Sequence, residues 1–184
     1  MSLEFWKKAS PMRRRIITIL VIFVAMVILT AVATLTPMDE TQARQTYNDL
    51  NKTVNDLKNN NSMLQFIFGN NFELTLIMFV PFIGPIFGFY ILYNTGVVLE
   101  ASAMAQNFPP TLTFFILFLE PVVWLEFAAY STAMAGSIWL SARIIQNRAK
   151  HELTNTAKFI AICAVLLLVG AIVETVLIEA AGTA

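Results

Sequence analysis

The chain has 184 residues, of which 57% are hydrophobic and 13% are charged, and its mean hydropathy is +0.67. About a quarter of the residues of an ordinary soluble domain are charged, so this composition excludes a soluble globular fold and predicts an integral membrane protein. The formal net charge is zero, and no basic patch is interleaved with aromatic residues, which excludes nucleic acid as a partner.

A basic segment and an apolar run open the sequence. Residues 1–15 carry five Lys and Arg residues beside Leu3, Phe5 and Trp6, which is typical of a cytoplasmic segment lying on an anionic membrane surface; a solvated basic tail is the alternative. Residues 16–35 contain no charge, and a helix of this length at about 1.5 Å per residue spans a hydrocarbon core of about 30 Å. We expect the first transmembrane helix here rather than a signal peptide, whose apolar region is shorter.

Residues 36–63 predict a polar helix outside the membrane. Thr36 is the expected N-cap, followed by Pro37 at the first helical position. A narrow apolar stripe then runs along an otherwise solvated helix. The stripe consists of Ala43, Tyr47, Leu50, Val54 and Leu57. We expect it to pack on the chain's own membrane bundle; a coiled-coil contact with another chain, which needs a longer repeat, is the alternative.

Four further apolar segments follow, and each is predicted to cross the membrane. They are residues 72–93, 97–119, 121–142 and 157–178. The segment 97–119 is broken near Pro109 and Pro110, where two backbone donors are missing, and a re-entrant pair of half-helices is the alternative there. Residues 64–184 then form one membrane domain. The expected fold class is all-α: a polytopic transmembrane bundle of about five spans, with an amphipathic helix outside the membrane.

The twelve Lys and Arg residues predict the orientation in the cell membrane. Five lie in residues 1–15 and four in residues 143–158, and the positive-inside rule puts both regions in the cytoplasm. Residues 36–71 are then extracytoplasmic. Asn51 and Asn60 each start an N-x-[ST] sequon in that region and are possible glycosylation sites.

Glutamates inside or beside the apolar segments provide the candidate functional site. Residues 59–142 contain no Lys or Arg, so a carboxylate buried there must be protonated, hydrogen-bonded or neutralised by a cation. At about 1.5 Å per residue, Glu126 and Glu174 come within roughly 6 to 8 Å of the outer surface. Glu100 is expected alone on the inner side, beyond an inner turn at residues 94–96.

Two interpretations of these glutamates stay open. The functional one is an outward-facing cation or proton site made by Glu126 and Glu174. The structural one is a set of hydrogen bonds between helices, to backbone groups freed at proline breaks or to asparagines. The residues assigned to the candidate polar site are Glu73, Glu120, Glu126, Glu174, Asn70, Asn71 and Asn94.

The stretch from residue 81 to residue 88 predicts close helix packing. Gly84 and Gly88 form a small-xxx-small pair that lets another helix approach, and Pro81 and Pro85 are expected to bend the span. Packing is the expected role of this stretch.

Catalytic and metal-binding patterns are missing from the sequence. His151 is the only histidine and Cys163 the only cysteine, which excludes a disulfide framework and a multi-histidine metal site within one chain. No phosphate-cradling glycine loop is present. We therefore expect a protein that is not an enzyme and needs no cofactor.

A recognisable order of polar and small residues runs through the second half of the chain. It consists of Phe68–Asn71 (F-x-N-N), the Gly84/Gly88 span, Asn94–Gly96 (N-x-G), Pro121–Glu126 (P-x-x-x-x-E) and Glu174. This order resembles the stage II sporulation protein M family over residues 64–184. The chain departs from the family pattern at Val122 and Val123, which stand where the family has His-Gly, and at Thr95, which interrupts an Asn-Gly.

The resemblance implies a multi-span, non-enzymatic membrane protein that works inside an assembly, with membrane lipids and other integral membrane subunits as partners. A structural or accessory subunit is the expected function, in a membrane-remodelling complex or, as another concrete form, in an ammonia monooxygenase-type assembly. A small cation or proton transporter or channel that uses the membrane-level glutamates is the alternative. The two sequons without disulfides would suit an archaeal member of the family.

Overall fold

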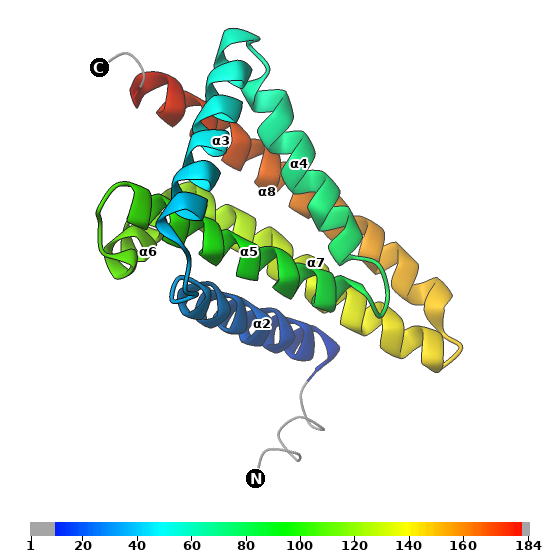
Figure 1. The fold of residues 1–184 in the computed structure, drawn as a ribbon. Coiled ribbons are helices and arrows are strands. Elements are labelled where there is room, and N and C mark those ends of the chain that lie inside the picture. Colours follow the sequence, from blue (N-terminus) through cyan, green and yellow to red (C-terminus); the bar gives the residue numbers. More distant parts are fainter. Residues whose placement is uncertain (1–9, 182–184) are drawn as a thin grey trace.

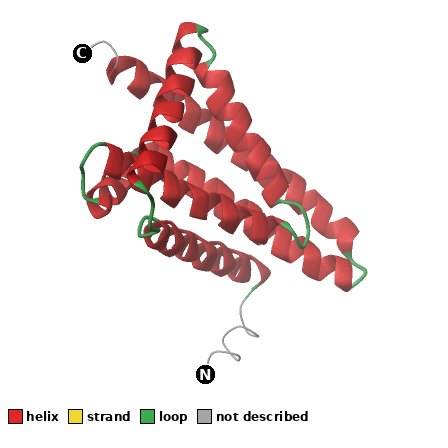
Figure 2. Ribbon diagram, viewed as in Figure 1, coloured by secondary structure: helices red, strands yellow, loops and turns green. Residues whose placement is uncertain are grey.

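A computed structural model describes residues 10–181, and within them the chain forms seven helices and no strand (Figures 1 and 2). The helices are α2 (Pro11–Ala33), α3 (Glu40–Asn59), α4 (Met63–Met78), α5 (Gly84–Ala105), α6 (Pro110–Leu119), α7 (Pro121–Ile145) and α8 (Ala149–Ala181). The all-α prediction is confirmed. Most of the predicted interfacial segment, residues 1–9, lies outside the described residues.

Apolar helices long enough to cross a bilayer make this a multi-pass membrane protein. Helices α2, α5 and α8 each have the length and hydropathy of a span, and α6 with α7 does so as a pair whose axes are bent by 85°. The described residues thus contain three candidate spans, or four with the bent pair. The predicted number of about five is not confirmed, because α4 has only 16 residues and is about 24 Å long.

Helix α7 is the centre of the bundle and packs against α2, α4, α5, α6 and α8 (Figure 1). Its middle, residues 128–137, is rich in Ala, Ser and Gly, and small side chains let neighbouring helices approach closely. Gly136 shows this directly: a Cβ at this position would lie 2.7 Å from the Phe79 ring. Helix α8 runs antiparallel to α7, with Glu152 beside Arg143 and Cys163 beside Ala129.

The side chains between these helices form one large apolar core. Met26, Met78, Leu92, Met134 and Cys163 come from α2, α4, α5, α7 and α8 respectively, and each is at most 1% exposed. They belong to a single contiguous cluster of buried residues, which we call the apolar core. It is the main reason that these helices, each apolar nearly all round, adopt one arrangement.

The predicted second span, residues 72–93, is wrong as a single helix. The chain breaks at residues 79–83, where α4 ends and α5 turns back along the bundle. Pro81 lies in the break and Pro85 in the first turn of α5, and proline cannot donate the backbone hydrogen bonds that would continue a helix. The outcome is a reversal of direction rather than the predicted bend.

Two serines of α7 bind the backbone groups that the break releases. The Ser137 hydroxyl donates to the Val80 carbonyl over 2.6 Å, and the Phe82 N–H donates to the Ser141 hydroxyl over 2.8 Å. Phe82 has a φ of 67°, a left-handed conformation that costs an aromatic residue about 1–2 kcal/mol. The hydrogen bonds from α7 therefore help to hold a strained turn.

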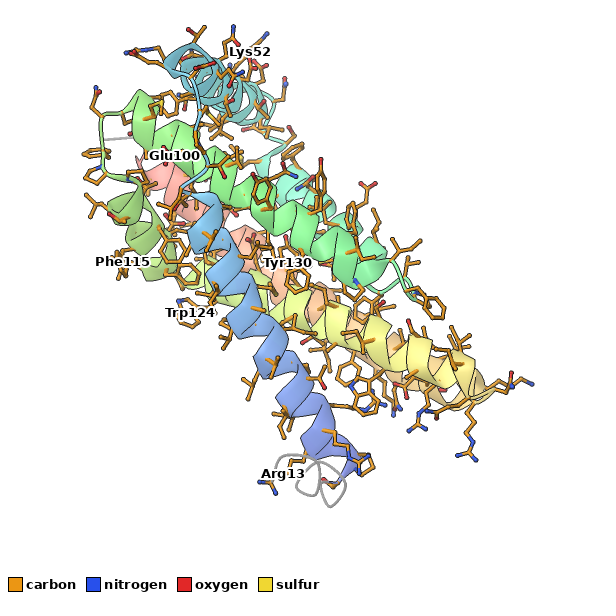
Figure 3. The ribbon with its side chains drawn as sticks, turned by 60° about the horizontal axis from the view of Figure 1, so that its bottom comes forward. Arg13, Lys52, Glu100, Phe115, Trp124 and Tyr130 are labelled. Atoms are coloured by element: carbon orange, nitrogen blue, oxygen red, sulfur yellow. The ribbon has the colours of Figure 1, made fainter. Side chains whose placement is uncertain are left out.

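The break changes the expected position of Glu100. Residues 94–96 were predicted to form an inner turn, but they lie inside α5, which continues to Ala105. Gly96 packs against Thr30 and Ala33 near the end of α2, so Glu100 lies close to α3 and not at the opposite end of the bundle (Figure 3). The predicted third span, residues 97–119, is accordingly the last part of α5, a turn and α6.

Three helices end in the same way, each with an asparagine in the left-handed conformation. Asn61, Asn107 and Asn147 have φ values of 49°, 57° and 54°. After α7, the N–H of Arg148 bonds to the Arg143 carbonyl, and the corresponding bonds close α3 and α5. This is the Schellman arrangement, in which asparagine can replace the usual glycine.

Helix α3 begins later than predicted. Its N-cap is Asp39 and not Thr36, because Thr36 still belongs to the turn that ends α2 and its hydroxyl pairs with that of Tyr93 at 3.2 Å. Most of the apolar stripe of α3 packs on the chain's own helices: Ala43 is fully buried, and Val54 and Leu57 contact a small cluster formed by α4 and α8. Leu50 of the stripe is 42% exposed.

Candidate polar site between helices α4, α7 and α8

Asn71 of α4 forms the centre of a polar cluster against α7. Its side-chain N–H donates to Glu126 Oε1 over 2.5 Å, and its Oδ1 accepts from the Tyr130 hydroxyl over 3.0 Å. Glu126 and Tyr130 lie one turn apart on α7, where the i, i+4 spacing puts both on the face that meets α4. Tyr130 is only 5% exposed and lies among the helices in Figure 3, so the cluster connects two helices inside the bundle.

Two further glutamates lie near enough to interact electrostatically with Glu126. They are Glu174 of α8, which is partly buried, and Glu120 at the junction of α6 and α7, which is exposed. The salt bridges formed within residues 10–181 involve Glu40 and Glu152 instead. The arrangement therefore gathers carboxyl groups around one neutral amide, and hydrogen bonds rather than ion pairs hold it together.

The remaining predicted site residues do not join this cluster. Glu73 lies on α4 and is exposed. Asn70 is also exposed, and its side-chain N–H donates a long hydrogen bond of 3.5 Å to Asn71 Oδ1. Asn94 donates to the Tyr90 carbonyl of its own helix over 3.0 Å. Within residues 10–181, no group of three or more His, Cys, Asp or Glu side chains is arranged to hold a metal ion.

A second group of charged residues lies at the other end of α7. Arg15 of α2 forms a 2.6 Å salt bridge with Glu152 of α8, and the two side chains are only 12% and 3% exposed. The Arg15 guanidinium also lies 5.1 Å from the centre of the Trp139 ring, a cation–π distance. This pair was not predicted, because Glu152 lies among four basic residues in the sequence, a pattern typical of a solvated loop.

The candidate glycosylation sites lie on α3. Asn51 is exposed within the helix, and Asn60 is exposed at its C-cap. In Figure 3, Lys52 on this helix lies at the opposite end of the molecule from Arg13. Glycosylation at either asparagine stays a prediction.

Comparison with known proteins gives one decisive match. The family model of stage II sporulation protein M matches residues 18–177. The chain belongs to the stage II sporulation protein M family. The match begins within α2 and includes α3, so the family region is longer than the predicted residues 64–184. Searches of curated proteins and of solved structures gave no match.

Replacing Asn71 by alanine should destabilise this family member by about 1–3 kcal/mol, because it leaves the buried Tyr130 hydroxyl and Glu126 without their partner. Asn70→Ala is the matched control, one residue away but exposed, and it should change stability by less than about 0.5 kcal/mol. Unfolding in mixed micelles, followed by circular dichroism, measures both. Equal effects of the two substitutions would show that the cluster does not connect the helices.

Proposed function

We propose that the protein is a non-enzymatic structural or accessory subunit of a membrane complex. The observation that carries this proposal is the position of the apolar core between the two polar regions. Along α7, Tyr130 is followed by the buried Met134 before Arg143 is reached; along α8, Cys163 and Leu167 lie between Glu152 and Glu174. A conducting protein needs a polar path past these buried apolar residues, whereas a structural subunit needs none.

The polar cluster itself supports a role in packing. Both polar atoms of the Asn71 amide are used, one by Glu126 and one by Tyr130. Interhelical hydrogen bonds of this kind contribute about 0.6 kcal/mol on average and serve as ties between transmembrane helices. The cluster then fixes α4 on α7, which is what a subunit with a fixed outer shape requires.

The outer surface offers apolar area for lipids and neighbouring subunits. Helix α6 has no buried residue, and Phe115 and Leu119 are 66% and 81% exposed. The Trp124 indole N–H donates to the Phe118 carbonyl over 2.9 Å, which holds α6 in its bent position. A short apolar helix at the edge of the bundle, bent by 85° from α7, suits lateral contact within a membrane assembly.

The positive-inside rule orients the subunit within its membrane. Arg15, Arg143, Arg148 and Lys150 gather at one end of the bundle and favour a cytoplasmic position for that end, with α3 on the extracytoplasmic side of the cell membrane. A membrane-remodelling complex is one setting for such a subunit, and an ammonia monooxygenase-type assembly in an archaeon is another.

Native co-purification tests the proposal. The protein should be extracted with a mild detergent from its own membrane, and the bound chains should be identified and quantified by mass spectrometry. We expect at least one integral membrane protein in a fixed stoichiometric ratio. Recovery of the chain alone, or with partners in ratios that vary between two detergents, would contradict the proposal.

A small cation or proton transporter is the second candidate function. The electrostatic interaction of Glu120 and Glu174 with Glu126, with no salt bridge to any of the three among the described residues, is the observation that favours it. Flux measured in proteoliposomes separates the two functions. Flux that is lost on Glu126→Gln would establish the transporter, whereas the subunit proposal predicts no flux above that of empty liposomes.

A further inference from the structure

A pocket of about 890 Å³ opens at the basic end of the bundle. It lies where α2 begins and where α7 passes into α8, and its polar lining comes from both regions. The residues that the argument uses are Arg15, Arg143, Arg148, Lys150, Glu152 and Ile144. Neither the polar cluster at Glu126 nor the proposed subunit function involves this pocket.

The pocket carries an excess of positive charge. Among the described residues that line it, Glu152 is the only acidic one, and it is already paired with Arg15 at 2.6 Å. The Nε atom of Arg143 lies 4.0 Å from Glu152 Oε2, and the Arg143 guanidinium donates a hydrogen bond to the Gln146 side-chain oxygen. Arg148 and Lys150 are exposed, and no hydrogen bond or salt bridge of their side chains is found within residues 10–181. They can therefore bind an anion without breaking a contact of the bundle.

The one acidic residue among the described lining residues, Glu152, does not offer its free oxygen to a ligand. Oε1 of Glu152 is buried and has no hydrogen-bond partner among the described residues, and the residue is 2% exposed. An unpaired carboxylate oxygen is costly to bury. Because this oxygen is closed off from the pocket, it offers no contact to a ligand, and the charged groups that a ligand meets are basic.

The surroundings of the pocket place it at the edge of the apolar surface. The first residue of the charge-free run, Ile16, follows Arg15 directly and is 47% exposed, and Ile144 and Ile145 are 39% and 72% exposed. An anion that binds here lies beside surface suited to acyl chains. Basic pockets between membrane helices, close to the interface, are typical sites for anionic lipid headgroups.

We propose that this pocket binds the headgroup of an anionic phospholipid, with the phosphate between Arg148, Lys150 and Arg143. A lipid headgroup and a soluble phosphate compound both carry the phosphate group that such a pocket would bind. The apolar rim at Ile144 and Ile145 favours the lipid as its source.

The test titrates the purified full-length protein in detergent with phosphatidylglycerol, with phosphatidylcholine and with inorganic phosphate, and counts bound molecules by native mass spectrometry. The pocket variant is Arg148→Gln/Lys150→Gln. The control variant, Lys52→Gln/Lys58→Gln, removes the same charge from α3 at the other end of the molecule. At roughly fivefold for each cationic side chain, we expect the pocket variant to bind phosphatidylglycerol about 30-fold more weakly.

The outcomes decide the proposal in either direction. It is supported when the wild type and the control variant prefer phosphatidylglycerol to phosphatidylcholine and the pocket variant loses this preference, with circular dichroism spectra unchanged. Equal losses in the two variants, or no loss in either, overturn it. Displacement of the lipid by inorganic phosphate at the same concentration overturns the assignment to a lipid.

Discussion

Gly84→Ala is expected to lower the free energy of unfolding by about 3 kcal/mol, the upper end of the range for overpacked sites. A Cβ on Gly84 would overlap the carbonyl group of Met78 and lie 2.8 Å from Ser137 Oγ. The first obstacle is backbone, which cannot rotate away as a long side chain can. The α4–α5 reversal would have to open, and the hydrogen bond from Ser137 to Val80 would be strained with it. Unfolding in mixed micelles measures the loss.

Gly69→Ala is the matched control for this prediction. Gly69 also lies in a helix, α4, but a Cβ there meets nothing within 4 Å. Alanine is the better helix former by about 1 kcal/mol, so this variant should be as stable as the wild type or slightly more stable. If Gly84→Ala were equally well tolerated, the close approach of α5 to Met78 and Ser137 would be refuted.

Arg15→Met is expected to cost about 3–5 kcal/mol, because it removes the close partner of a buried carboxylate. Among the described residues, Glu152 would keep only Arg143, whose Nε lies 4.0 Å away, and its Oε1 already has no hydrogen-bond partner there. The contacts of the guanidinium with Trp139 and Phe159 would also be lost. Thermal and micellar unfolding of the purified variant measures the cost.

A double substitution distinguishes the missing charge from the missing volume. In Arg15→Met/Glu152→Leu both charges are replaced by apolar groups, and such replacements are often neutral or stabilising, so stability should return to within about 1 kcal/mol of the wild type. Glu40→Gln provides the surface comparison: its salt bridge with Arg44 is exposed and should matter by less than about 1 kcal/mol. An Arg15→Met variant no weaker than Glu40→Gln would contradict a buried pair.

Composition and pattern were enough to predict the class of the molecule. The apolar runs with few charges could only be stable in a bilayer, where helices satisfy their own backbone groups, and all the described elements are helical. The order of residues from Phe68 to Glu174 pointed to the correct family. These are properties of single segments, which a sequence displays directly.

The reversal between α4 and α5 depends on residues far away in the sequence. Pro81 and Pro85 predict an interruption, but a bend and a full reversal require different partners for the freed backbone groups. Those partners are Ser137 and Ser141 on α7, and nothing local to the prolines indicates them. The expected inner turn at residues 94–96 failed for the same reason.

Part of the polar site was predicted, including a hydrogen bond between a glutamate and an asparagine of different helices as one of the two interpretations. Asn71, Glu126 and Glu174 were all named from the sequence, whereas Tyr130 was not, because an aromatic residue in an apolar run reads as core. Its hydroxyl binds Asn71 Oδ1, and the i, i+4 spacing from Glu126 was the signal that could have identified it. A search for polar side chains at helical spacing from Glu126 would therefore have identified Tyr130.

The most direct test of the central claim uses the single native cysteine. Cys163 is fully buried in the apolar core and lies midway along α8 between Glu152 and Glu174. A small, charged, water-borne thiol reagent should not modify it in nanodiscs until the protein is denatured, whereas a cysteine placed by Asn70→Cys in a Cys163→Ala background should react readily. Modification of Cys163 in the folded protein at a comparable rate would reveal a water path through the bundle and contradict the packed subunit proposed above.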